Sequence, residues 1–143
     1  MHGDATLEVE LPYPPSVNHY WRYARGRFYI SPAGHSYRKA VAAALFGCEK
    51  LSGPVALEIE VYPPDRRRRD LDNILKSVLD ALEHAGAFDD DAQVASIFVE
   101  RKEVVREGKC RVRLRKITPC SDTLRRVRIR SIPSRTKRKK TAD

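Results

Sequence analysis

The sequence lacks the cysteine and histidine patterns that stabilise small secreted domains or bind zinc. Among its 143 residues are three cysteines, Cys48, Cys110 and Cys120, which are widely spaced and form no C-x-x-C pair. An odd number of cysteines at such spacing argues against a disulfide framework and against a zinc site. The four histidines are scattered, and none occurs in an H-E-x-x-H motif. We therefore interpret the cysteines as buried thiols and the histidines as ordinary core or surface side chains.

Long apolar runs are also absent. The N-terminal residues MHGDATLEVE carry acids where a signal peptide needs an apolar run. The apolar stretch over residues 41–47 is far too short to cross a bilayer. With 41% hydrophobic and 33% charged residues, the composition is that of a soluble globular protein with one core. We expect a cytoplasmic protein with no membrane partner and no small-molecule cofactor.

Positive charge is abundant but unevenly distributed. The chain carries a net charge of +9, and residues 122–143 contain nine lysines and arginines against two acids. That segment therefore holds +7 of the excess, and the body is nearly neutral. A polycationic segment favours a polyanionic partner, most simply a nucleic acid. The alternative is a solubilising or disordered tail without a specific target.

Two hydrophobic periodicities divide the chain into strands and helices. Strict alternation, as in TLEVEL and VALEIEVY, predicts strands with one polar face, and apolar residues at helical spacing between residues 71 and 82 predict a helix that Gly86 ends. The expected strands cover residues 6–11, 27–30, 55–62, 94–105 and 110–116, and the expected helices cover residues 31–50 and 71–85. This order predicts an α+β fold. One domain over residues 1–118 has two main helices packed on one side of a mixed or antiparallel sheet.

Arginines alternate along the last strand, at Arg111, Arg113 and Arg115. The polar faces of two other strands carry glutamates, at positions 8, 10, 58 and 60. We interpret this pattern as cross-strand ion pairing rather than as a DNA-binding surface. Beyond it, residues 119–143 form a basic extension whose alternating residues 123–132 predict either an added edge strand or an arm that orders on nucleic acid, followed by a disordered tail.

The stretch DRRRRDLDNILK, residues 65–76, carries most of the chemistry. Carboxylates two residues apart share a side only in an extended or cap conformation. We therefore expect Asp70 just outside the helix and Asp72 in its first turn, where together they can bind a hard cation such as Mg²⁺. The structural alternatives are a helix cap for Asp72 and a salt bridge to the neighbouring arginines for Asp70.

A third carboxylate is sought in the acidic loop FDDDAQ. Asp90 and Asp91 are both candidates. The intervening helix is roughly 20 Å long, so the next strand has to run back, or a loop has to fold back, before either acid reaches Asp70. The sequence leaves this geometry open.

The cations in this stretch have two interpretations. Lys76 stands four residues after Asp72, which is the spacing of an ordinary helical ion pair. Alternatively, its ammonium stabilises charge on a phosphorane-like transition state or on the leaving oxygen. The arginines can hold phosphates that flank a metal-bound scissile group. These arginines are Arg66, Arg67, Arg68 and Arg69.

The motifs together resemble the RusA-type Holliday-junction resolvases. The resemblance rests on PYPPSVNHYWR, YISPAGHSYR, PDRRRRDLDNILKSVLDAL and DDAQV, and it covers about the first 117 residues. It implies a homodimeric endonuclease, dependent on Mg²⁺ with Mn²⁺ as a substitute, that nicks four-way DNA junctions in pairs. The implied catalytic residues are Asp70, Asp72, Lys76 and Asp91, of which the three aspartates bind the metal. The implied DNA contacts are Ser16, Asn18, His19, Arg66, Arg67, Arg68, Arg69 and Asn73.

Two other functions are compatible with the same features. A non-catalytic protein that binds branched DNA would explain the basic tail and the arginines, but it gives no reason for aspartates that repel phosphate. A nuclease of the same fold could act instead on forks, flaps or other branched DNA.

Overall fold

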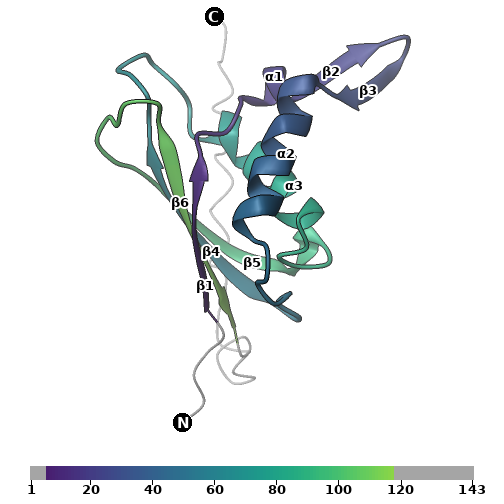
Figure 1. The fold of residues 1–143 in the computed structure, drawn as a ribbon, viewed down its shortest axis with the longest axis vertical. Coiled ribbons are helices and arrows are strands. Elements are labelled where there is room, and N and C mark those ends of the chain that lie inside the picture. The colour runs from purple at the N-terminus through teal and green to yellow at the C-terminus, as the bar shows by residue number, and fades with distance from the viewer. Residues whose placement is uncertain (1–5, 118–143) are drawn as a thin grey trace, which may run out of the picture.

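The computed structural model describes residues 6–117 and has the single-domain α+β architecture expected from the sequence (Figure 1). The elements α1, β2 and η1 were not predicted, because segments of three or four residues are too short to show a hydrophobic period. In chain order the elements are β1 (Thr6–Pro12), α1 (Val17–Tyr20), β2 (Trp21–Ala24), β3 (Arg27–Ile30), α2 (Pro32–Ala44), β4 (Val55–Tyr62), α3 (Asp72–His84), η1 (Asp91–Gln93), β5 (Val94–Arg101) and β6 (Lys109–Lys116).

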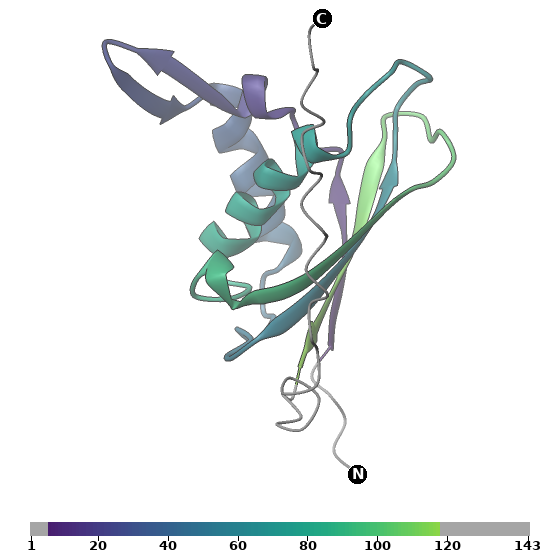
Figure 2. The same ribbon diagram turned by 180° about the vertical axis from the view of Figure 1, so that it is seen from behind.

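Four strands form a mixed sheet in the order β1-β6-β4-β5. β6 pairs antiparallel with both β1 and β4, whereas β5 runs parallel to β4. The two long helices, α2 and α3, cover one face of this sheet, as predicted (Figures 1 and 2). The core lies between these layers. Its fully buried side chains include Leu57, Ile59, Val78, Leu82, Val112 and Leu114.

The opposite face of the sheet carries the alternating charges. Arg113 on β6 lies between Glu8 on β1 and Glu58 on β4, and its guanidinium is 3.5 Å from each carboxylate. The cross-strand register likewise aligns Arg111 with Glu10 and Glu60. The interpretation of these arginines as structural partners of the glutamates is therefore confirmed for Arg113.

Two element boundaries differ from the prediction by more than one residue. α2 ends at Ala44 and not at residue 50, because Gly47 adopts a left-handed φ of +81° that a helix does not continue through. As a result Cys48 is exposed, and its interpretation as a buried thiol was wrong. β5 ends at Arg101 and not at residue 105, because its partner strand is followed by Pro63, which cannot extend a ladder.

The basic extension from residue 119, including the strand or arm expected at residues 123–132, lies outside the described residues. Within the part that is described, none of the helices combines the length and apolar character that a membrane span requires.

A partly buried polar network joins the three helices. The Tyr20 hydroxyl at the end of α1 donates to Asp80 on α3, and Arg38 on α2 donates from Nε to both groups, at 3.0 Å and 2.9 Å. Burial, and then the hydrogen bond to Asp80, raise the pKa of Tyr20 well above its ordinary value. The phenol therefore stays a neutral donor, and the network holds the end of α1 against both long helices.

We predict that Asp80→Ala lowers the free energy of unfolding by about 2 kcal/mol, because it leaves the Arg38 guanidinium and the Tyr20 hydroxyl without their shared acceptor. Asp89→Ala is the matched control. Asp89 pairs with Lys50 at 2.7 Å on the surface, where ion pairs contribute little. Urea denaturation monitored by circular dichroism measures both changes. Equal stability of the two variants would contradict a structural role for the network.

Candidate active site and nucleic-acid interface

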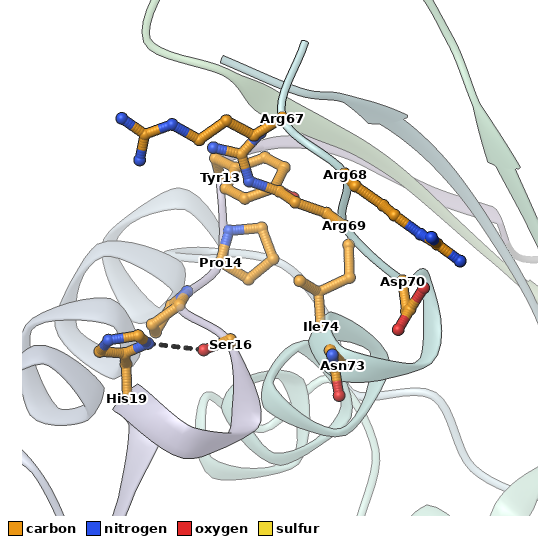
Figure 3. A pocket seen from close by; sticks show the side chains of 11 residues that line it. Tyr13, Pro14, Ser16, His19, Arg67, Arg68, Arg69, Asp70, Asn73 and Ile74 are labelled. Atoms are coloured by element: carbon orange, nitrogen blue, oxygen red, sulfur yellow. Dashed lines mark hydrogen bonds between the residues drawn. The ribbon is translucent and has the colours of Figure 1, made fainter. Parts of the chain in front are cut away.

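A pocket of about 570 Å³ lies between the loop that follows β1 and the segment that precedes α3. Ser16 and His19 face Asp70 and Asn73 across this pocket (Figure 3). The Ser16 hydroxyl and His19 Nδ1 are hydrogen-bonded at 2.6 Å. The structure thus brings together most of the predicted DNA contacts, from two segments about 50 residues apart in the sequence. The full lining is Tyr13, Pro14, Pro15, Ser16, His19, Arg67, Arg68, Arg69, Asp70, Asn73 and Ile74.

The predicted contacts Asn18 and Arg66 lie outside this lining. Asn18 is exposed on α1. Arg66 lines a second pocket of about 330 Å³, whose lining shares the other three arginines with the first pocket. Asp70 lines both pockets, and Arg101 at the end of β5 lines the second. Asp70 is therefore the acidic residue that the two pockets share.

The arginines differ in what they contact. Arg69 donates to both Asp65 oxygens, at 2.5 Å and 2.9 Å, and its guanidinium lies 5.7 Å from the centre of the Tyr13 ring. The Arg69 hydrogen bonds, followed by the Arg67 backbone N–H, lower the pKa of Asp65 to about 2. Arg101 donates to the Arg69 carbonyl. Arg69 therefore orders the segment.

Arg66, Arg67 and Arg68 have exposed side chains at the same segment. The Nε atom of Arg67 is 3.9 Å from Asp65 Oδ2. Figure 3 shows the side chains of Arg67 and Arg68 extending away from each other at the pocket. Because Asp65 accepts from Arg69, it neutralises one arginine and leaves the others available for an external anion.

Asp70 and Asp72 stand where the sequence predicted, Asp70 just before α3 and Asp72 in its first turn. Leu71 is the residue at the cap position, and it makes no side-chain cap. Within residues 6–117, neither carboxylate has a hydrogen-bond or ion-pair partner, so neither the helix cap nor the arginine salt bridge is formed. Two unpaired, exposed carboxylates at one helix end are suitable ligands for Mg²⁺, which takes few carboxylates together with water and phosphate oxygens.

Lys76 lies one turn further along α3 and does not pair with Asp72. Its Nζ is 5.1 Å from the centre of the Trp21 ring, and this ring in turn packs against Tyr20 with 4.2 Å between ring centres. A cation over an indole face is attracted by the ring quadrupole. Trp21, which the sequence analysis did not single out although it is the only tryptophan, therefore positions the predicted catalytic cation.

Asp91 lies at the far end of α3 from Asp70. The helix has 13 residues and is about 20 Å long. The strand that returns toward Asp70, β5, begins only after Asp91, so it does not carry Asp91 back with it. At the last turn of α3, burial is the main cause that raises the pKa of Glu83, and nearby carboxylates add to it, with Asp91 first among them. In the part of the chain that the structure describes, no three acids, histidines or cysteines cluster as metal ligands. The three aspartates therefore do not meet within one chain.

The three aspartates of the acidic loop differ in what they contact. Asp89 pairs with Lys50, and Asp90 accepts from the Ala92 N–H at 2.8 Å as the cap of η1. The Ala92 hydrogen bond is the main cause that lowers the pKa of Asp90. Asp91 is exposed and has neither role, which favours it over Asp90 as a functional carboxylate.

A sequence model of the family described as Endodeoxyribonuclease RusA matches residues 12–115. The chain belongs to this RusA family. Crossover junction endodeoxyribonuclease RusA of Enterobacteria phage 82 is 46% identical over 107 residues, which make up 73% of this chain and 89% of that protein. The proteins of the same name from Escherichia coli strain K12 and Shigella sonnei are each 44% identical over the same length and with the same coverage.

The RusA match includes both segments that line the pocket, the whole of α3, and β5 with its acidic loop. Residues 116–143, which contain the basic extension, lie beyond it. The family resemblance inferred from the motifs is thus confirmed, whereas the roles of the individual site residues remain predictions.

Proposed function

We propose that this RusA-family protein is a structure-selective endodeoxyribonuclease that resolves four-way DNA junctions by paired, symmetrical nicks in recombination and repair. One observation carries the proposal. Asp70 and Asp72 are unpaired carboxylates beside exposed arginines, in a family whose members include crossover junction endodeoxyribonucleases. A protein that only binds DNA gains nothing from unpaired acids at its basic surface, because they repel phosphate.

Asp70 and Asp72 would hold Mg²⁺, or Mn²⁺ in its place. When bound, the ion polarises the scissile phosphate and acidifies a bound water. The exposed Arg66, Arg67 and Arg68 grip the flanking phosphates and offset the negative charge of the site. Lys76, held over Trp21, places a positive charge where the transition state gains negative charge.

The second subunit of the proposed homodimer docks on β5. This strand is at the edge of the sheet, and among residues 6–117 it pairs only with β4. At its middle, Ile97 is 42% exposed and Phe98 is 61% exposed, so large apolar side chains lie uncovered on both faces of one edge strand. An exposed apolar edge is a template for pairing with another chain, and two-fold pairing of β5 with itself covers it.

This pairing also supplies the missing carboxylate. The last residue of β5, Arg101, contacts Arg69 next to Asp70, whereas the first residue of β5 follows the loop with Asp91. Two β5 strands paired antiparallel about a two-fold axis place the start of one beside the end of the other. The partner subunit's Asp91 then approaches Asp70 and Asp72, and each of the two composite sites contains residues from both chains.

The proposal is tested with a labelled four-way junction and a linear duplex of the same sequence, each incubated with and without Mg²⁺. We expect symmetrical nicks in the junction only, and only with the metal, because the two sites are related by the same two-fold symmetry as the substrate. Denaturing gels of both strand pairs give the nick positions. Retarded complexes without any product in Mg²⁺ or Mn²⁺ would instead indicate a protein that binds branched DNA without cutting it.

A further inference from the structure

The hairpin formed by β2 and β3 has no place in the site described so far. It projects from the helical layer away from the main sheet (Figures 1 and 2). Its two-residue turn, Arg25 and Gly26, has positive φ at both positions, 52° and 76°, as in the tight turns that suit a twisted hairpin. Three of its aromatic side chains are open to solvent: Tyr23 (64% exposed), Phe28 (77%) and Tyr29 (47%).

The pairing register separates the hairpin into an aromatic and a basic face. Trp21 is opposite Ile30, and Tyr23 is opposite Phe28, so these two pairs share one face. The other face holds Arg22 opposite Tyr29, and Ala24 opposite Arg27. On the aromatic face the rings of Tyr23 and Phe28 have centres 4.9 Å apart. Aromatic surface therefore extends from the buried root of the hairpin to its exposed end.

The charge of the hairpin favours a polyanion. Its charged residues are Arg22, Arg25 and Arg27, and no aspartate or glutamate occurs between Glu10 and Glu49. A docking arm for another protein has no need for charge of one sign only. Aromatic rings combined with arginines are the combination that binds unpaired nucleotides, because bases stack on the rings while the arginines hold phosphates.

The root of the hairpin is fixed next to the proposed catalytic cation. Tyr20, one residue before β2, belongs to the network with Asp80 and Arg38, and the Ser31 N–H, just after β3, donates to its carbonyl at 2.9 Å. Trp21 lies against Lys76. The next pair on the aromatic face, Tyr23 and Phe28, is only about 7 Å further along the strands. A group held by these rings therefore lies near the phosphate whose negative charge Lys76 is proposed to stabilise.

We propose that Tyr23 and Phe28 form a stacking platform for a nucleobase that is unstacked at the branch point of the junction, while Arg22, Arg25 and Arg27 hold the adjacent phosphates. The proposal rests on the proposed function, and it names the element that distinguishes a branch from a linear duplex. A continuous duplex offers no exposed base face, so it gains only the phosphate contacts.

The test compares binding of a four-way junction and a linear duplex in EDTA, where no cleavage takes place. The double variant Tyr23→Ala/Phe28→Ala is expected to lose about tenfold in affinity for the junction, and its affinity for the duplex should change less than about twofold. Tyr29→Ala is the matched control, since it removes an exposed ring from the opposite face. It should keep the junction preference. A 2-aminopurine at the branch point should change its fluorescence with the wild type and with Tyr29→Ala, but not with the double variant.

Three results would overturn the platform. The first is an unchanged affinity of the double variant for the junction, and the second is an equal loss of affinity for junction and duplex. The third is loss of the dimer in sedimentation of the double variant, which would mean that the hairpin joins the subunits. Circular dichroism and thermal melting verify that the double variant is folded. These binding measurements are made without metal, so they do not depend on cleavage. If the wild-type protein prefers junctions in EDTA but does not cut them in Mg²⁺, the proposed nuclease activity is refuted and the stacking platform is not.

Discussion

Asp70→Asn abolishes cleavage of a four-way junction in Mg²⁺ and leaves binding of the junction intact or tighter. Substitutions that only disturb the groups around metal ligands already reduce metal affinity or activity about 10- to 100-fold, so the loss of a direct ligand should cost at least about a hundredfold in rate. Asparagine keeps the size of the side chain but removes the charge. Single-turnover cleavage and gel-shift titration measure the two effects separately.

Binding is expected to survive because the affinity for DNA comes from the exposed arginines and not from Asp70. Removal of one negative charge beside the phosphates lowers repulsion. Asp72→Asn should behave in the same way. Asp89→Asn is the control substitution. Asp89 pairs with Lys50 at the far end of α3, so the variant should cleave the junction at the wild-type rate. If both Asp70→Asn and Asp72→Asn cut the junction at the wild-type rate, the assignment of the metal site is wrong.

A mixture of Asp70→Asn and Asp91→Asn subunits regains cleavage although each variant alone is inactive. In the composite arrangement, one site of the mixed dimer receives both substitutions and the other receives none. The intact site should nick one strand of each junction, and it should not make the paired cut. Co-expression of differently tagged subunits provides the mixed dimer, and denaturing gels count the nicks.

The reciprocal mixture distinguishes the composite site from a site within one chain. A subunit carrying both substitutions, paired with a wild-type subunit, leaves no intact composite site, so this dimer should be inactive. A site built within one chain would predict the opposite outcome for both mixtures. The wild-type subunit would then retain its nick, and the dimer of single variants would have none. Purified mixed dimers with that pattern would refute the composite site and the β5 pairing that produces it.

The separation of Asp70 and Asp91 illustrates what a sequence does not contain. Both residues belong to motifs that are easily recognised, and the length of α3 already indicated that the intervening helix keeps them apart. Whether a loop folds back depends on non-local packing. In the structure Gln93 donates to the carbonyls of Leu51 and Gly53, at 3.2 Å and 2.8 Å, and so anchors the acidic loop at the far end.

The choice of partner for each charged group was equally beyond the sequence. The RRRRD pattern left a salt bridge between Asp70 and its neighbouring arginines open as an alternative, but Asp65 pairs with Arg69 instead. Local spacing allows both pairings, and the Tyr13 ring and Arg101, which come from distant segments, fix the orientation of Arg69. The same holds for Lys76, whose spacing to Asp72 allowed an ion pair and whose ammonium lies over Trp21.

The sequence by itself determined the elements and the chemical character of this protein. Alternation of apolar and polar residues defined the strands, helical spacing defined α3, and unusual motifs identified the RusA family, because each of these signals is local along the chain. Tertiary structure alone decided which charges are paired, that the hairpin presents three rings to solvent and Trp21 to Lys76, and that Asp91 lies a helix length from Asp70. Those properties depend on contacts between segments tens of residues apart, which the periodicity of a single segment does not encode.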